Sequence, residues 1–110
     1  MSDWQDKFQQ EIRRAQECRA NDNEGQARVC ARRAAGLVAR EYLSRRGLPA
    51  LSSSAYDLVK SLSDLPDLPD GALQAARYLT LRVNEQFELP LQADLIQEAQ
   101  RLREQLLPGE

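Results

Sequence analysis

Histidine is absent from this chain of 110 residues. Imidazole is the commonest general base near neutral pH, so neither a Ser–His nor a Cys–His catalytic pair can form. No glycine-rich loop precedes a predicted helix, which excludes a phosphate-binding loop and a dinucleotide-binding fingerprint. These kinds of catalytic and nucleotide-binding site are therefore not expected in this chain.

Cysteine is scarce, and the two thiols are Cys18 and Cys30. Two thiols cannot make a zinc site without other ligands, and their spacing fits no CxxC motif. Both fall on apolar faces of predicted helices, so we expect buried free thiols, with a disulfide as the alternative. Glu85 and Glu88 could converge with Asp94 near the last connector, but a metal site needs more convergent oxygens than a sequence can show. No metal and no cofactor is expected.

Long apolar runs are also missing, and no stretch approaches the ~20 residues that a membrane-spanning helix needs. The first ten residues, MSDWQDKFQQ, are acidic and amphipathic, unlike a signal peptide, so we expect a cytoplasmic location. Hydrophobic residues make up 42% of the chain and charged residues 29%. This balance is typical of a folded domain, and the length suits a single domain over residues 1–110.

The net charge of −2 conceals an uneven distribution. Residues 1–21 hold four acids and four bases, whereas residues 22–48 hold six arginines and three acids. Residues 49–110 hold five bases and ten acids. A nucleic-acid-binding domain usually has a stronger basic excess, so only a local basic patch is compatible with such binding.

The first half of the chain predicts two helices. Apolar residues recur at steps of three or four over residues 4–18, which is the pattern of one helix face. A second helix is expected over residues 24–46. Gly47 stands where a C-terminal glycine belongs, and Pro49 blocks continuation of the helix.

The second half predicts three further helices. A short one lies within residues 52–62, a fourth is capped by Asp70 and ends near residues 86–90, and a fifth begins around residues 90–92. The inner face of the fourth is expected to hold Leu73, Ala76, Leu79, Thr80 and Val83. No run alternates as a strand does. We therefore predict an all-α fold, an antiparallel up-and-down bundle of four to five helices.

Small and apolar residues form one broad stripe on the second predicted helix. The stripe holds Ala27, Cys30, Ala31, Ala34, Ala35, Val38 and Tyr42. Small side chains let a neighbouring helix approach closely, so we expect this helix to be the centre of the bundle. Leu37 and Leu43 widen the apolar surface, so the helix is buried on more than one side, or one side meets another subunit.

The arginines of this helix occupy the remaining arc, and they are Arg28, Arg32, Arg33 and Arg40. We favour a solvated face with local acid partners. A phosphate or RNA contact and a contact with a partner protein are the alternatives. A second polar cluster lies on and just past the fourth helix, at Tyr78, Arg82, Asn84 and Glu85. It is interpreted either as a helix end with local hydrogen bonds or as a ligand-binding cluster.

Four segments carry a family resemblance by their order. They are ARVCARRAAGLVAREYLSRRGLP at 27–49, SSSAYDLVKSL at 52–62, AARYLTLRVNEQFELP at 75–90 and ADLIQEAQRLREQL at 93–106. The chain resembles the HEPN domains (higher eukaryote and prokaryote nucleotide-binding), small helical bundles that usually pair as dimers. In many members the short third helix opens with His-Ser/Asp-Leu, and Tyr56 stands in the histidine's place here.

The RNase branch of that family has an arginine and a histidine with four to six residues between them. The best-placed arginine is Arg82, and the histidine positions hold Phe87, Glu88 and Leu89. Asn84 stands one residue beyond the usual asparagine. Neither phenylalanine nor leucine can transfer a proton, so the resemblance points to the non-catalytic branch, which accompanies minimal nucleotidyltransferases.

The resemblance therefore implies a non-enzymatic homodimeric accessory module, toxin–antitoxin-like, that holds substrate or nucleotide for a separate nucleotidyltransferase chain. Tyr78 and Arg82 would line the cleft near the dimer axis, and Arg32, Arg33 and Arg40 would form an alternative basic contact surface. The other functions considered are an RNA- or nucleotide-binding protein and a degenerate HEPN ribonuclease that lacks the motif histidine.

Overall fold

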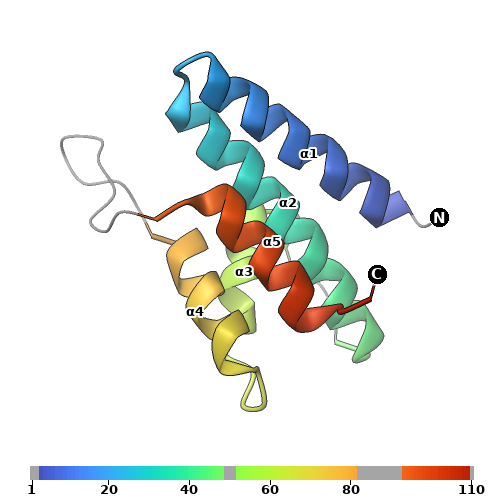
Figure 1. The fold of residues 1–110 in the computed structure, drawn as a ribbon. Helices are drawn as coiled ribbons and strands as arrows, with labels where there is room; N and C mark the ends of the chain where they lie inside the picture. Colours follow the sequence, from blue (N-terminus) through green and yellow to red (C-terminus); the bar gives the residue numbers. More distant parts are fainter. Residues whose placement is uncertain (1–2, 49–51, 82–92, 110) are drawn as a thin grey trace.

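The computed structural model describes residues 3–48, 52–81 and 93–109. Five helices and no strand lie within these ranges, which confirms the all-α prediction. The helices are α1 (Asp3–Ala20), α2 (Glu24–Arg45), α3 (Ala55–Leu62), α4 (Asp70–Leu79) and α5 (Leu95–Leu106). α1 and α2 form a long antiparallel hairpin, and the three shorter helices lie beside it (Figure 1).

Local side chains mark the starts of three helices. Asn23 accepts a hydrogen bond from the Gln26 amide at 3.2 Å at the start of α2, as expected for an N-cap. Ser54 and Asp94 do the same for α3 and α5. α2 ends just before Gly47, whose φ of +70° is the left-handed conformation that favours glycine.

The predicted limits of the last two helices were wrong. Asp70 is the first residue of α4 and does not cap it, because Pro69 holds the N-cap position without a side-chain hydrogen bond. α4 ends at Leu79, well before residues 86–90, and its buried face is Ala72, Ala75, Ala76 and Leu79. Thr80 follows as a turn, while Val83 lies outside the described residues. α5 begins at Leu95, later than residues 90–92, because Asp94 is its cap.

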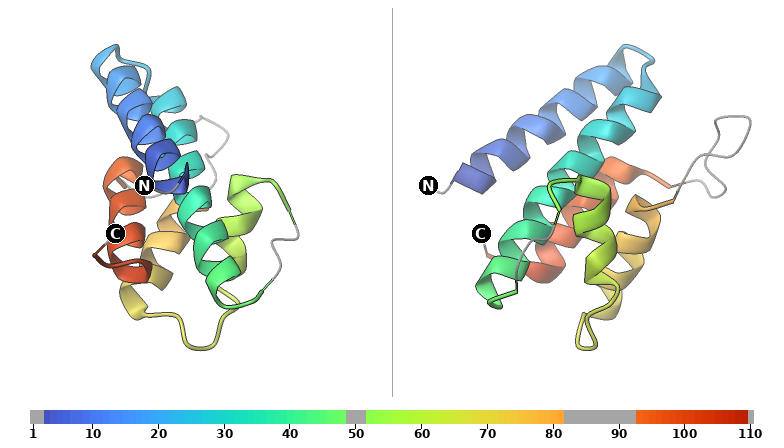
Figure 2. Two further views of the ribbon diagram at one scale, coloured as in Figure 1. Left: turned by 90° about the vertical axis from the view of Figure 1, so that its right-hand side faces the viewer. Right: turned by 180° about the vertical axis from the view of Figure 1, so that it is seen from behind.

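α2 is the central helix, as its stripe of small residues predicts. It packs against α1, α3 and α5, and Figure 2 shows α3 and α5 on different sides of its second half. Its buried residues are Ala27, Cys30, Ala31, Ala34, Ala35, Gly36, Val38, Ala39 and Leu43. Tyr42 is only half-buried. The burial on several sides therefore comes from this chain's own helices.

α2 and α3 approach each other closely at Gly36. A Cβ atom placed there would lie 2.8 Å from the Cβ and 2.9 Å from the Cα of Ala55, the first residue of α3. Any larger residue at position 36 would force the two helices apart, so the absence of a side chain sets how α3 sits on α2. This contact also forms one wall of the groove described below.

Candidate functional site

A groove with a volume of about 370 Å³ is bounded by α1, α2 and the start of α3. Four basic side chains line it, two from α1 and two from α2: Lys7, Arg14, Arg33 and Arg40. Its apolar lining consists of Gly36, Leu37, Ala55 and Leu58. We call this feature the basic groove.

Glu11 is the one acid among the described residues of the basic groove. Its carboxylate lies 3.4 Å from the Arg14 guanidinium, and its side chain is 14% exposed against 63% for Arg14. Lys7, Arg33 and Arg40 are exposed, and none of them makes an ion pair with another described residue. The groove thus concentrates positive charge on a chain whose net charge is −2.

A second hollow continues the basic groove along the α1–α2 hairpin. It shares Lys7, Leu37 and Arg40 with the groove and is completed by residues of both helices, Asp3, Trp4 and Glu41. Glu41 is already paired with Arg45 at 2.8 Å. Lys7 and Arg40, which make no ion pair with the described residues, therefore lie at the junction of the two hollows.

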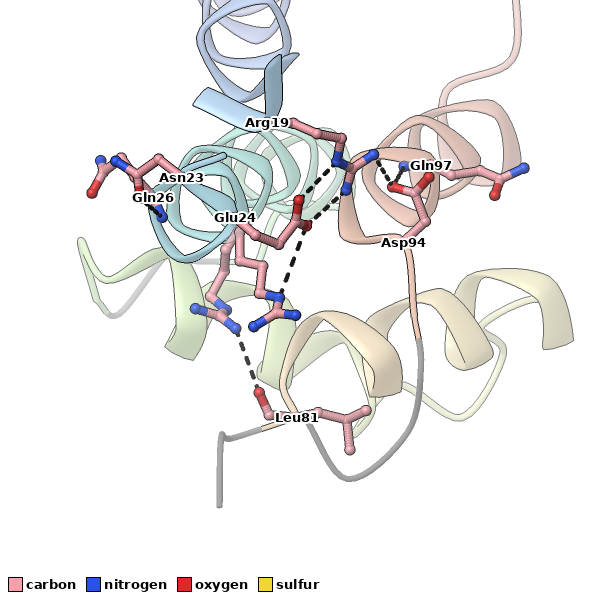
Figure 3. Close-up of polar contacts among 9 residues, drawn as sticks. Arg19, Asn23, Glu24, Gln26, Leu81, Asp94 and Gln97 are labelled. Carbon is pink, nitrogen blue, oxygen red and sulfur yellow. Dashed lines mark hydrogen bonds and ion pairs between the residues drawn. The ribbon is translucent and has the colours of Figure 1, made fainter. Parts of the chain in front are cut away.

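Arg32 does not share this surface, although it is the immediate neighbour of Arg33. Its side chain is half-buried and crosses to the end of α4, where Nε donates to the Leu79 carbonyl at 2.7 Å. Nη2 donates to the Leu81 carbonyl at 3.4 Å (Figure 3). Of the three arginines proposed as a basic surface, the structure brings together Arg33 and Arg40 and holds Arg32 in an internal contact.

The second predicted cluster falls mainly outside the described residues, where Arg82, Asn84 and Glu85 lie. Tyr78 is described, and it is half-buried in α4 against the hydrophobic core. The role of Tyr78 in a ligand-binding cluster therefore stays a prediction.

A three-helix ion-pair cluster occupies the other end of the hairpin. Arg19 at the end of α1 donates two hydrogen bonds of 2.9 Å to Glu24 and lies 3.0 Å from the Asp94 carboxylate (Figure 3). The hydrogen bonds from Arg19 lower the pKa of Glu24. In turn, the carboxylates of Glu24 and Asp94 raise the pKa of Arg19. The cluster joins the ends of α1, α2 and α5. The Nε atom of Arg28 lies 4.0 Å from the Glu24 carboxylate, so two arginines face two carboxylates, and we assign the cluster a structural role.

The two thiols are free. Cys30 is buried on α2, Cys18 is half-buried on α1, and burial raises the pKa of the Cys30 thiol. Within the described ranges, no group of three or more Cys, Asp or Glu side chains is placed to hold a metal ion. No helix in that part of the chain combines the length and apolarity needed to cross a bilayer.

The sequence analysis missed Lys7 and Arg14 as groove residues. Both belong to the first predicted helix, for which the sequence indicates no function. One signal was present: Lys7 and Arg14 are seven residues apart, as are Arg33 and Arg40. A separation of seven residues places both side chains on the same face of a helix, about two turns apart.

Comparison with family models, with curated protein sequences and with solved structures finds no match for this chain. The geometry of the basic groove therefore carries the functional argument.

Proposed function

We propose that the protein is a non-enzymatic interaction module that binds an acidic segment of a partner protein in the basic groove. The observation that carries this proposal is the set of three exposed cations, Lys7, Arg33 and Arg40, which make no ion pair within the described residues and flank an apolar surface. Carboxylates of a partner would pair with these cations, while an apolar side chain would cover the half-buried Leu37.

A partner protein fits the groove better than a nucleic acid does. Single-stranded nucleic acids are held by stacking of bases on aromatic rings, which is worth about 1–3 kcal/mol per base. None of the described residues that line the basic groove is aromatic. The sequence pI of about 5.2 also differs from the basic character typical of RNA-binding domains.

The broader identity within this proposal is a HEPN-like module that pairs as a homodimer and accompanies a separate nucleotidyltransferase chain. Its support is the order of the sequence segments and the position of Tyr56. A non-catalytic role is supported by the absence of histidine from the whole chain. RNA binding and residual ribonuclease activity are the competing functions, and both are tested below.

The experiment measures binding of fluorescently labelled poly-L-glutamate to the full chain by anisotropy, at low and at high salt. We expect binding that weakens with salt and is lost in the double variant R33E/R40E. The matched control is R13E/R77E, which makes the same change in net charge at two exposed arginines outside the groove. Equal loss in both double variants would show a nonspecific charge effect and would contradict the groove.

Two further measurements test the competing functions. Size-exclusion chromatography with light scattering, with and without a short RNA, reports the mass of the protein and of any complex. A salt-insensitive dimer that ignores RNA agrees with the module proposed here, whereas an RNA complex that forms only at low salt contradicts it. Cleavage of labelled RNA by the purified chain, with or without divalent metal, would overturn the non-enzymatic assignment.

A further inference from the structure

We infer that the basic groove takes an amphipathic α-helix of the partner that carries two acids seven residues apart and an apolar residue between them. This inference rests on the proposed function, and it adds the conformation and the spacing of the bound segment. It follows from the arrangement of four cations on two antiparallel helices.

The cations form two pairs along the groove. Lys7 and Arg14 on α1 are seven residues apart, and so are Arg33 and Arg40 on α2. Because a helix rises 1.5 Å per residue, each separation is about 10.5 Å along the axis. The two helices are antiparallel (Figure 1), and Lys7 and Arg40 also line the second hollow together. One pair is therefore Lys7 with Arg40, and the other is Arg14 with Arg33.

Between the two pairs, the groove is apolar on the side of α2 and α3, whereas the α1 side carries Gln10 and Glu11. Leu37 lies between Arg33 and Arg40 in the sequence of α2, Gly36 presents no side chain, and Leu58 is 4% exposed. Glu11 sits at the Arg14 end with its carboxylate turned to that guanidinium. An apolar side chain of the partner would find its contact beside Leu37, near the middle of the groove.

A helix matches this pattern and a strand does not. Two acids at i and i+7 of a helix lie about 10.5 Å apart on one face, with i+3 or i+4 on the same face between them. A strand rises about 3.3 Å per residue, so the nearest match is i and i+3, whose side chains point to opposite faces. Strand residues that share a face lie about 7 or 13 Å apart, which misses the cation pairs.

The test compares two synthetic helical peptides of identical composition. The first carries glutamates at i and i+7 with leucine at i+3, and the second moves one glutamate to i+5, about 140° around the helix from its partner. We expect the full chain to bind the first peptide at least tenfold more tightly by anisotropy. Equal affinities for the two peptides would overturn the inference.

Protein variants locate the bound peptide. R40E and R33E should each reduce binding of the i,i+7 peptide, whereas the control R13E should leave it unchanged. An otherwise identical peptide with lysine at i and i+7 should bind R33E/R40E better than the wild type, because the charges are exchanged. Circular dichroism of each variant checks that the fold is retained. Failure of this exchange in a folded variant would contradict direct pairing with Arg33 and Arg40.

Poly-L-glutamate separates this inference from the proposed function. If poly-L-glutamate binds through Arg33 and Arg40 but the two peptides bind equally, the helical occupant is wrong and the acidic-partner groove stands. If neither poly-L-glutamate nor peptide binds, both proposals fall. If a short RNA binds more tightly than the i,i+7 peptide and R33E/R40E abolishes that binding, the partner class is wrong.

Discussion

The guanidinium of Arg32 in α2 donates a hydrogen bond of 2.7 Å to the carbonyl oxygen of Leu79, the last residue of α4. The carbonyls in the last turn of a helix have no partner within the helix, so an arginine from a neighbouring element stabilises that end. α4 packs mainly against α5 and α3, and Arg32 adds a direct link to the central helix.

Replacement of Arg32 by methionine should therefore destabilise the fold. Methionine keeps the apolar stem but removes the donors to Leu79 and Leu81, and we expect a loss of about 1–2 kcal/mol in the free energy of unfolding. The control R33M removes an exposed arginine of the same helix and should change it by less than about 0.5 kcal/mol. Urea denaturation measures both, and equal effects would contradict the assigned role of Arg32.

Glu24 should make the free energy of unfolding depend on pH in the acidic range. Its pKa is lowered by the hydrogen bonds from Arg19. A carboxyl whose pKa is lower in the folded state stabilises the fold above its unfolded pKa, and this contribution is lost as the pH falls through the folded pKa. Because the side chain is 40% exposed, E24Q should lower stability by only about 0.5–1 kcal/mol near pH 7.

The same E24Q variant should match the wild type at a pH below the lowered pKa of Glu24, because both side chains are then neutral. Denaturation at the two pH values measures the difference. The control E17Q changes an exposed glutamate near the end of α1 and should show little effect at either pH. A penalty for E24Q that persists at acidic pH would show that packing, rather than the ion pair with Arg19, is responsible.

The two thiols should react at different rates. Cys30 is 3% exposed and burial raises its pKa, whereas Cys18 is half-buried. Since the thiolate is the reactive form, a thiol reagent should modify Cys18 first and reach Cys30 mainly after unfolding. The variants C18A and C30A assign the two phases. An absence of reactive thiols in the denatured, unreduced protein would indicate a disulfide and contradict this prediction.

The central helix could be predicted because its signals are local. The stripe from Ala27 to Val38 gives its buried face, Asn23 supplies the cap, and Gly47 adopts the positive φ that ends it. The end of α4 could not be predicted, because Arg32 contacts it from 47 residues away in the sequence. The apolar periodicity alone predicted that this helix would continue to residues 86–90.

Only half of the residues that form the basic groove could be predicted from the sequence. Arg33 and Arg40 stand out on α2 because they lie opposite the alanines. Lys7 and Arg14 look like ordinary surface residues of α1 until the hairpin brings them beside α2. Packing across the hairpin decides which faces of the two helices meet. The sequence of either helix alone does not contain that information.

Glycines 36 and 25 in α2 should respond in opposite directions to alanine. A Cβ at Gly36 would lie 2.8 Å from the Ala55 Cβ and 2.9 Å from its Cα, and the backbone of α3 cannot yield as a flexible side chain does. We expect G36A to lower the free energy of unfolding by about 1–3 kcal/mol, despite the better helix propensity of alanine. At Gly25 no atom lies within 4 Å of the added Cβ, so G25A should raise stability by up to about 1 kcal/mol.

Urea denaturation of both variants measures the difference. A stabilising G36A would show that α3 does not pack on α2 at this contact, and would remove the wall that Ala55 gives to the basic groove.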